Sequence, residues 1–223
     1  MLVEESIWIG NKINDVLHCF PFPVLNIGSS TKEYRTVIQP FIQKNIFDKF
    51  ADEQKNVIHV DSKKAEGVDI VGNLYDEEFF RKLKSYRPGL ILCNNTLMYL
   101  NKPLREKLAE IFYEILTEGG YLIITNSFIF PPSPDPVEEY YRKAPLEIYK
   151  TLFSKFNLIE QKIVETNYSY YKLFKSKNYK FKVVKAITFF LPFYKFRQWK
   201  FMLKYYLFNF RKKYSASCLF LQK

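Results

Sequence analysis

A chain of 223 residues with a hydrophobic fraction of 48% and a charged fraction of 26% has the composition of a globular protein with a sizeable core. Its net charge of +11 is unevenly placed: residues up to Glu165 carry all 23 acids against 20 Lys+Arg, whereas residues from Thr166 onward carry 14 Lys+Arg and no acid. Two histidines and three scattered cysteines argue against a zinc site or a histidine-based triad.

The N-terminus and the apolar runs indicate where the protein resides. The start MLVEESIWIG carries acids where a secretory signal would carry positive charge. No apolar run reaches the roughly 18 residues that a membrane-spanning helix needs. We therefore expect a cytoplasmic protein with reduced cysteines. We also expect one domain over 1–223, with 166–213 as a basic, aromatic insertion.

Up to residue 125 the chain alternates between helical and strand-like patterns. Ile7, Ile9, Ile13, Val16 and Leu17 recur at roughly helical spacing and predict a first helix that covers one edge of a sheet. Pro40 lies in the first turn of a second predicted helix, where its missing N–H costs least. We expect helices over 4–19, 40–50, 75–84 and 103–116, and strands over 24–27, 56–60, 67–74, 89–93 and 121–125.

Polar or small residues follow each of these apolar strands. Five strands alternating with helices indicate an α/β fold with a parallel sheet, in which ligands bind at the carboxyl ends of the strands. The clustering of polar residues at one sheet edge therefore predicts a binding site there. The residues at these ends are Gly28-Ser29-Ser30, Asp61, Gly72-Asn73, Asn94-Asn95-Thr96 and Thr125-Asn126.

After the fifth strand, prolines between 131 and 136 predict a stiff loop. Residues 137–156 are predicted to form a helix, interrupted or kinked at Pro145. Strands expected over 158–164 and 215–221 could pair in antiparallel fashion at the sheet edge.

Between these two strands, residues 168–213 alternate Lys and Arg with Tyr, Phe and Trp. A helix over 193–213 would place an apolar seam on one side, with Phe201, Tyr205 and Phe208 on the far side. Three interpretations are open: a lid packed on the sheet, a helix pair on an anionic membrane surface, or a platform for single-stranded RNA. RNA ranks third because no recognisable RNA-binding motif accompanies the segment. The seam would contain Phe196, Trp199, Leu203, Tyr206 and Phe210.

The order of these pieces resembles the class I S-adenosylmethionine-dependent methyltransferases. More narrowly, it looks like the methyltransferase-type-11-like proteins of sugar and polysaccharide modification. The resemblance runs from about residue 22 to about 165, in VLNIGSS, VIHVDSKKAEGVDIVGNL, LILCNNTLMYL, LTEGGYLIIT and PPSPDPVEEYYR, with 215–221 as the last strand. It implies a Rossmann-like, doubly wound, mostly parallel seven-stranded sheet whose last strand is antiparallel.

The resemblance also implies a role for each matched residue. Gly28, Ser29 and Ser30 would approach the methionine part of S-adenosylmethionine, and Asp61 would accept hydrogen bonds from both ribose hydroxyls. Asn73 and Leu74 would hold the adenine. Asn94, Asn95 and Thr96 would line the side on which the methyl group is transferred.

The chain also departs from the family pattern. Asn26, Ser30 and Lys32 stand where the family has an acidic residue and two glycines, and Asn73 stands where an aspartate is usual. Met98-Tyr99 replaces a Glu-His pair, and Ser133 replaces a histidine. Amides and hydroxyls can still bind the cofactor, so Asn26 remains a candidate contact. Asp135 and Tyr99 are the candidate general bases by position.

Two functions from different classes follow. The first is methyl transfer from S-adenosylmethionine to a small or lipid-linked acceptor, with a sugar hydroxyl preferred, at the cytoplasmic face of the membrane. An RNA acceptor is a variant of it. The second is a non-catalytic binding or scaffold protein that kept the fold while the glycine motif decayed.

Overall fold

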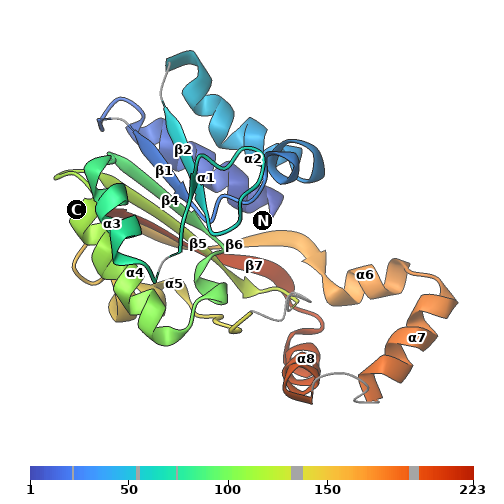
Figure 1. Ribbon diagram of the computed structural model, residues 1–223. Helices are drawn as coiled ribbons and strands as arrows, with labels where there is room; N and C mark the ends of the chain where they lie inside the picture. The colour runs from blue at the N-terminus through green and yellow to red at the C-terminus, as the bar shows by residue number, and fades with distance from the viewer. Residues whose placement is uncertain (22, 54–55, 74, 132–137, 191–195) are drawn as a thin grey trace.

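The computed structural model describes residues 1–21, 23–53, 56–73, 75–131, 138–190 and 196–223. Within them the chain forms a seven-stranded sheet of order β3-β2-β1-β4-β5-β7-β6 (Figure 1). Strands β1 to β5 pair in parallel, whereas β7 is antiparallel to both of its neighbours. The strands are β1 Val24–Ile27, β2 Val57–Asp61, β3 Ile70–Val71, β4 Leu90–Asn94, β5 Tyr121–Ile129, β6 Asn157–Ser169 and β7 Lys213–Gln222.

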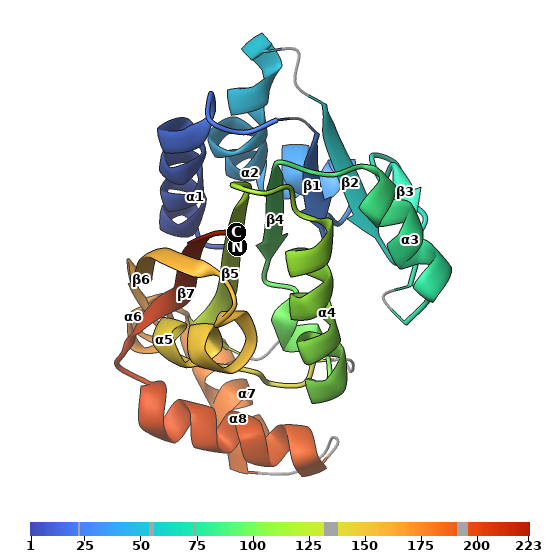
Figure 2. The same ribbon diagram turned by 90° about the vertical axis from the view of Figure 1, so that its left-hand side faces the viewer.

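Helices cover both faces of this sheet (Figure 2). On one face, α1 and α2 pack over Val24, Leu92 and Phe220. On the other, α3 and α4 pack over Leu25 and Ile91. The predicted doubly wound α/β architecture with an antiparallel last strand is therefore confirmed. The helices are α1 Val3–Val16, α2 Pro40–Asn45, α3 Glu77–Ser85, α4 Lys102–Ile115, α5 Pro145–Ile148, α6 Tyr170–Ser176, α7 Tyr179–Phe190 and α8 Phe196–Asn209.

One expectation about the helices of the α1 face is confirmed and another needs correction. α1 packs on the sheet beside the edge strand β6, where Trp8 Nε1 donates to Glu160 Oε1 at 2.9 Å, and Ile9 and Ile13 are buried while Ile7 is exposed. The helix expected over 40–50 ends at Asn45, and a 3₁₀ helix follows at Phe47–Glu53. Before α2, a π-helical turn occupies Tyr34–Ile38.

The helix predicted over 137–156 is wrong for its first half. The described residues 138–144 are not helical, and Pro145 begins α5 as a first-turn residue instead of kinking a longer helix. Side chains of the sheet hold this segment: Asn126 Nδ2 donates to the Tyr141 carbonyl at 2.8 Å, and Ser217 Oγ donates to the Lys143 carbonyl at 2.6 Å. These bonds compete with the helical ladder for the same carbonyls.

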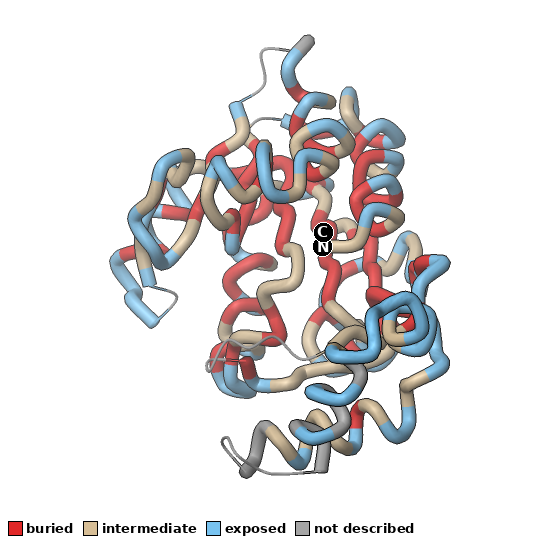
Figure 3. Tube along the Cα trace, turned by 90° about the vertical axis from the view of Figure 1, so that its right-hand side faces the viewer, coloured by how far each residue is buried: buried red, intermediate tan, exposed pale blue. Residues whose placement is uncertain are grey.

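Helices α6, α7 and α8 lie between β6 and β7 and form an arm that projects from the body (Figure 1). Buried residues concentrate in the sheet, whereas the arm is mostly exposed (Figure 3). The predicted seam of α8 is wrong in part. Tyr205, expected on the far side, is 6% exposed, and Phe201 stacks on Tyr140 with ring centroids 4.2 Å apart. Phe208 is exposed, as expected.

None of the described helices combines the length and the apolar character needed to cross a bilayer.

Candidate cofactor and acceptor site

The turn after β1 is a compact loop built around one glycine. Gly28 has φ +73°, and the N–H groups of Gly28 and Ser29 both donate to the Val60 carbonyl, at 2.9 and 3.0 Å. A Cβ on Gly28 would lie 2.2 Å from Thr96 Oγ1. Only glycine fits here, because the backbone conformation and the contact with the end of β4 both exclude a side chain. The loop therefore joins the ends of three neighbouring strands.

Asp61 ends β2 and holds the same loop. Its Oδ2 accepts a hydrogen bond from Ser30 N at 2.8 Å, and its Oδ1 accepts one from Lys63 N at 3.2 Å. An ionised carboxylate offers about four lone-pair sites, so each oxygen can accept one further bond. The half-buried Asp61 is thus positioned beside the turn with accepting capacity left for a ligand hydroxyl.

Arg35 was not identified from the sequence, yet it is central to this loop. Its Nη1 donates to the carbonyls of Ser29 and Ser30 at 2.8 and 2.7 Å, and its Nη2 donates to the Gly67 carbonyl at 2.7 Å. The side chain is 4% exposed, and burial lowers the pKa of Arg35. The guanidinium stays charged because its unperturbed pKa is so high. It therefore ties the turn to the segment before β3.

Asn26 lies on β1 behind the turn, and its Nδ2 is 3.0 Å from His59 Nδ1 on β2. The His59 ring packs edge-on against Phe47, with centroids 4.9 Å apart. Burial, followed by the charge of Arg35, lowers the pKa of His59 to about 4, and Asp69 opposes this shift. The imidazole is therefore neutral at neutral pH and can accept the amide hydrogen of Asn26.

Glu5 of α1 connects the residue after β4 with the middle of β5. This carboxylate is 1% exposed, and its Oε1 accepts hydrogen bonds from Asn95 Nδ2 at 2.7 Å and Thr125 Oγ1 at 2.5 Å. Ser127 Oγ donates to Asn95 Oδ1 at 2.9 Å, so Asn95 is held from both sides. Nothing in the local sequence around Glu5 indicates this role, because its partners lie about 90 and 120 residues away.

A cavity of about 80 Å³ lies between the turn and the end of β4. Typical ligand pockets measure roughly 300–1,000 Å³, so a nucleoside cofactor cannot fit inside it without side chains moving. The described residues that line this cavity include Tyr34, Arg35 and Phe47, which were not predicted from the sequence as site residues. The predicted residues that it does bring together are Asn26, Gly28, Ser29, Ser30, Asn94 and Asn95.

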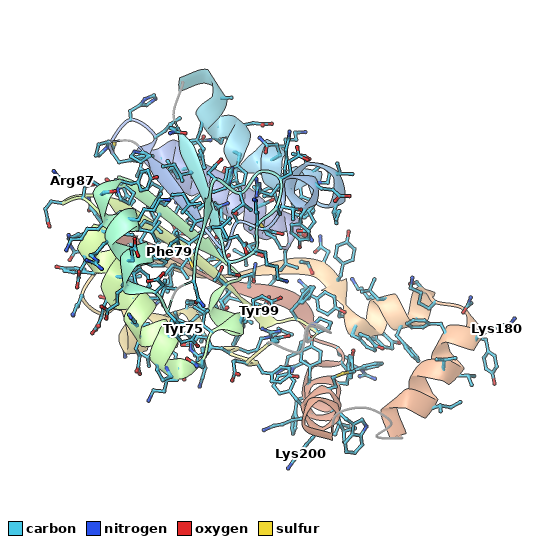
Figure 4. All side chains as sticks on the ribbon, viewed as in Figure 1. Tyr75, Phe79, Arg87, Tyr99, Lys180 and Lys200 are labelled. Atoms are coloured by element: carbon cyan, nitrogen blue, oxygen red, sulfur yellow. The ribbon has the colours of Figure 1, made fainter. Side chains whose placement is uncertain are left out.

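The remaining predicted residues lie elsewhere. Asn73 is exposed after β3, and its Oδ1 accepts a hydrogen bond from Tyr75 N at 3.0 Å. Tyr99 is half-buried at the end of the 3₁₀ turn after β4, on the side of the body from which the arm extends (Figure 4). Leu74 and Asp135 fall outside the described residues. The sequence expectations for Asn73, Tyr99, Leu74 and Asp135 thus stay predictions.

A second buried polar group lies where β5, β7, residues 138–144 and α8 meet. Arg142 forms an ion pair with the fully buried carboxylate of Glu138 and also contacts Met98 Sδ at 3.3 Å. Burial lowers the pKa of Arg142, and the charge of Glu138 opposes the shift. Burial also raises the pKa of Tyr205, whose hydroxyl is therefore neutral. Four buried side-chain atoms among the described residues have no hydrogen-bond partner: Asn126 Oδ1, Arg142 Nε, Tyr205 Oη and Ser215 Oγ.

Each such atom costs roughly 1–3 kcal/mol unless something satisfies it. Such atoms are uncommon in native structures and often mark a bound water, an ion or a functional site.

Neither a protein-family model nor a curated protein sequence matches this chain. Solved structures do match its fold. A SAM-dependent methyltransferase from Archaeoglobus fulgidus superposes with a TM-score of 0.53 at 12% identity, covering 98% of this chain and 94% of that one. Coclaurine N-methyltransferase bound to N-methylheliamine and SAH has a TM-score of 0.54 at 11% identity, covering 98% of this chain and 70% of that one.

A third solved structure with the same fold is the [4+2]-cyclase SpnF, with a TM-score of 0.55 at 11% identity. It covers 98% of this chain and 81% of that one. The chain therefore has the Rossmann-like fold of the SAM-dependent methyltransferases. At these identities the likeness concerns the fold, and the function has to be argued from the site.

Proposed function

We propose that this protein transfers a methyl group from S-adenosylmethionine to a hydroxyl group of a sugar, either free or lipid-linked. The observation that carries the proposal is the hydrogen bond between Ser30 N and Asp61. It places the one acceptor-only side chain at the end of β2 directly beside the small-residue turn after β1. Both lie at the carboxyl edge of a parallel sheet, where ligands of such folds bind.

The residues present fit the cofactor. Asp61 has lone pairs left for the two ribose hydroxyls, and Gly28 and Ser29 let the backbone come close to the methionine part. Asn73 and Leu74 would hold the adenine, and Asn94 to Thr96 would line the transfer side. When bound, the cofactor supplies an electrophilic methyl group on a sulfonium. Side chains that line the narrow cavity, such as Tyr34 and Phe47, would have to move to admit the cofactor.

The acceptor side is the buried polar group around Arg142 and Glu138. A sugar presents several hydroxyls that can both donate and accept, which matches unpartnered atoms of amide, guanidinium, phenol and alcohol type. Alignment of the acceptor oxygen would supply much of the rate. Tyr99 and Asp135 are the candidates for removing its proton.

Calorimetry with S-adenosylmethionine and S-adenosylhomocysteine tests the cofactor assignment. Asp61→Asn removes the acceptor-only group and should weaken binding by about 10- to 100-fold, because a hydrogen bond to a charged group contributes roughly 1.5–3 kcal/mol. Asp76→Asn is the matched control: Asp76 caps α3 by accepting from Glu78 N, and asparagine caps equally well. Absence of binding by the unaltered protein would refute the proposal.

The small cavity favours a second candidate, a non-catalytic binding or scaffold protein with this fold. The second candidate is also favoured by the departures from the glycine motif at Asn26, Ser30 and Lys32. Met98-Tyr99, which follows β4, favours it as well. Incubation of labelled S-adenosylmethionine with sugars, sugar nucleotides and lipid-linked sugars separates the two. Labelled product from any of them rules the second candidate out.

A further inference from the structure

The arm between β6 and β7 projects from the body and is joined to it at an aromatic base (Figure 1). Its base is aromatic: Tyr170 of α6 lies 4.4 Å from Tyr206 of α8 and 5.6 Å from Phe210, measured between ring centroids. The stack of Tyr140 on Phe201 then joins α8 to the body. From this base α7 extends away from the sheet, and its far side faces no other element among the described parts of the chain (Figure 1).

The described side chains on one exposed face of α7 are largely apolar. Tyr179 is 80% exposed, Val184 58% and Ile187 50%. At about 100° per residue, positions 179, 180, 183, 184 and 187 fall within an arc of about 140°, so these side chains form one face together with Lys180. An exposed apolar face on a projecting helix is the type of surface that enters the headgroup region of a bilayer.

Two further exposed apolar side chains of the arm, Leu207 and Phe208, lie on α8.

The charge of the arm identifies the partner. No acidic residue occurs from Thr166 to the end of the chain. The described basic side chains of the arm are exposed, and they are spread over α6, α7, α8 and the residues next to these helices: Lys172, Lys175, Lys177, Lys180, Lys200, Lys204, Arg211 and Lys212. Each basic residue close to an anionic leaflet strengthens binding roughly fivefold, so several together bind firmly but reversibly.

We propose that α6, α7 and α8 form a docking arm for anionic lipid surfaces, with the α7 face inserted among the headgroups and the lysines on the lipid phosphates. A second copy of this chain is a poor partner, because two such arms repel each other. Single-stranded RNA would stack on exposed rings such as Tyr179 and Phe208, but it would leave the aliphatic Val184 and Ile187 in water. The inference does not depend on methyl transfer, but it would bring the candidate site close to lipid-linked acceptors.

Co-sedimentation with vesicles tests the proposal, in the absence of any cofactor. Vesicles of phosphatidylcholine containing phosphatidylglycerol should bind the full chain, and high salt should weaken this binding because it screens the charges. Vesicles of phosphatidylcholine alone should bind at least tenfold more weakly. Equal binding to both vesicles, or binding to neither, would overturn the proposal. So would tight binding to a single-stranded RNA oligonucleotide that displaces the vesicles.

Charge-reversed variants locate the contact. Lys180→Glu, Lys200→Glu and Lys204→Glu together should weaken vesicle binding at least 100-fold, since each reversal removes an attraction worth roughly fivefold and adds a repulsion. The matched control makes the same change in charge outside the arm, at three exposed lysines: Lys64→Glu, Lys82→Glu and Lys150→Glu. Equal weakening by the two sets would show that net charge alone matters, and would overturn the docking arm.

The apolar face is tested separately. Val184→Ser with Ile187→Ser keeps every charge and should weaken vesicle binding about tenfold while leaving its dependence on salt unchanged. Val71→Ser with Ile159→Ser, which changes two comparably exposed side chains of the body, is the control. Circular dichroism verifies that all variants fold. The vesicle tests and the cofactor test can fail independently. The arm could fail to bind vesicles while the body still binds S-adenosylmethionine, or the body could fail to bind the cofactor while the arm still binds vesicles.

Discussion

Between about pH 8 and about pH 5, His59 should lower the free energy of unfolding of the wild-type protein by about 2 kcal/mol. Replacing His59 with asparagine should abolish this part of the pH dependence. In the folded protein the pKa of His59 is lowered from 6.5 to about 4, first by burial and then by the charge of Arg35. Protonation would also remove the lone pair on Nδ1 that faces Asn26 Nδ2 at 3.0 Å. The fold therefore favours the neutral imidazole.

The sign follows from which state binds more protons. Below about pH 6.5 the unfolded chain binds a proton at this histidine and the folded chain does not, so stability falls as the pH falls. The stability that His59 contributes is fully present above its unfolded-state pKa of 6.5. It is lost as the pH falls from there to the folded-state pKa of about 4. The whole shift corresponds to roughly 3 kcal/mol, of which about 2 kcal/mol is lost by pH 5.

Urea unfolding at the two pH values measures the effect, with the fluorescence of the buried Trp8 as the probe. His59→Asn keeps an acceptor for Asn26, so the variant should still fold, but without the pH dependence of an imidazole. His18→Asn is the control, because it makes the same substitution at the other histidine, which is exposed. If wild type and His59→Asn lose equal stability between the two pH values, the reasoning about His59 is refuted.

Three further substitutions test the buried contacts. Gly28→Ala should destabilise the protein by about 1–3 kcal/mol, and Thr96→Ala should recover part of this, because the new Cβ clashes with Thr96 Oγ1; urea midpoints without any recovery would contradict the contact. Arg35→Lys should cost about 3 kcal/mol in the same assay, since one ammonium cannot serve three carbonyls. A loss under about 1 kcal/mol would contradict this role. Glu138→Gln should cost about 3–5 kcal/mol by leaving the buried Arg142 without its counter-ion; thermal unfolding that stays at the wild-type temperature would contradict it.

The centre of the sheet could be predicted because β1 and β4 are apolar runs buried on both faces. Val24 to Ile27 and Leu90 to Cys93 are almost fully buried, and such continuous runs are read directly from sequence. The third strand was predicted too long because Asp69 instead bonds back to His59 N at 2.7 Å, which leaves only Ile70 and Val71 to pair.

The errors share one cause: the deciding contacts join residues far apart in sequence. Residues 138–144 have helical periodicity, but Asn126 and Ser217 bind their carbonyls from 15 and 74 residues away. In α8 the aromatic residues occupy every face, so the pattern could not show that Tyr205 rather than Trp199 would be buried. Glu5 was passed over for the same reason, because an acid in a first helical turn is ordinary in sequence.

Hydrogen bonds to Asp61 and Arg35 explain how a serine can stand at position 30 of the glycine motif. Ser30 stands where the family has glycine and has φ +57°, a conformation that costs a non-glycine residue roughly 1–2 kcal/mol. Its N–H donates to the Asp61 carboxylate and its carbonyl accepts from the Arg35 guanidinium. Hydrogen bonds to charged groups contribute roughly 1.5–3 kcal/mol each, enough to offset the strain. A turn held by charged partners on both sides does not need a second glycine, so the serine at this position is no argument against a ligand-binding loop.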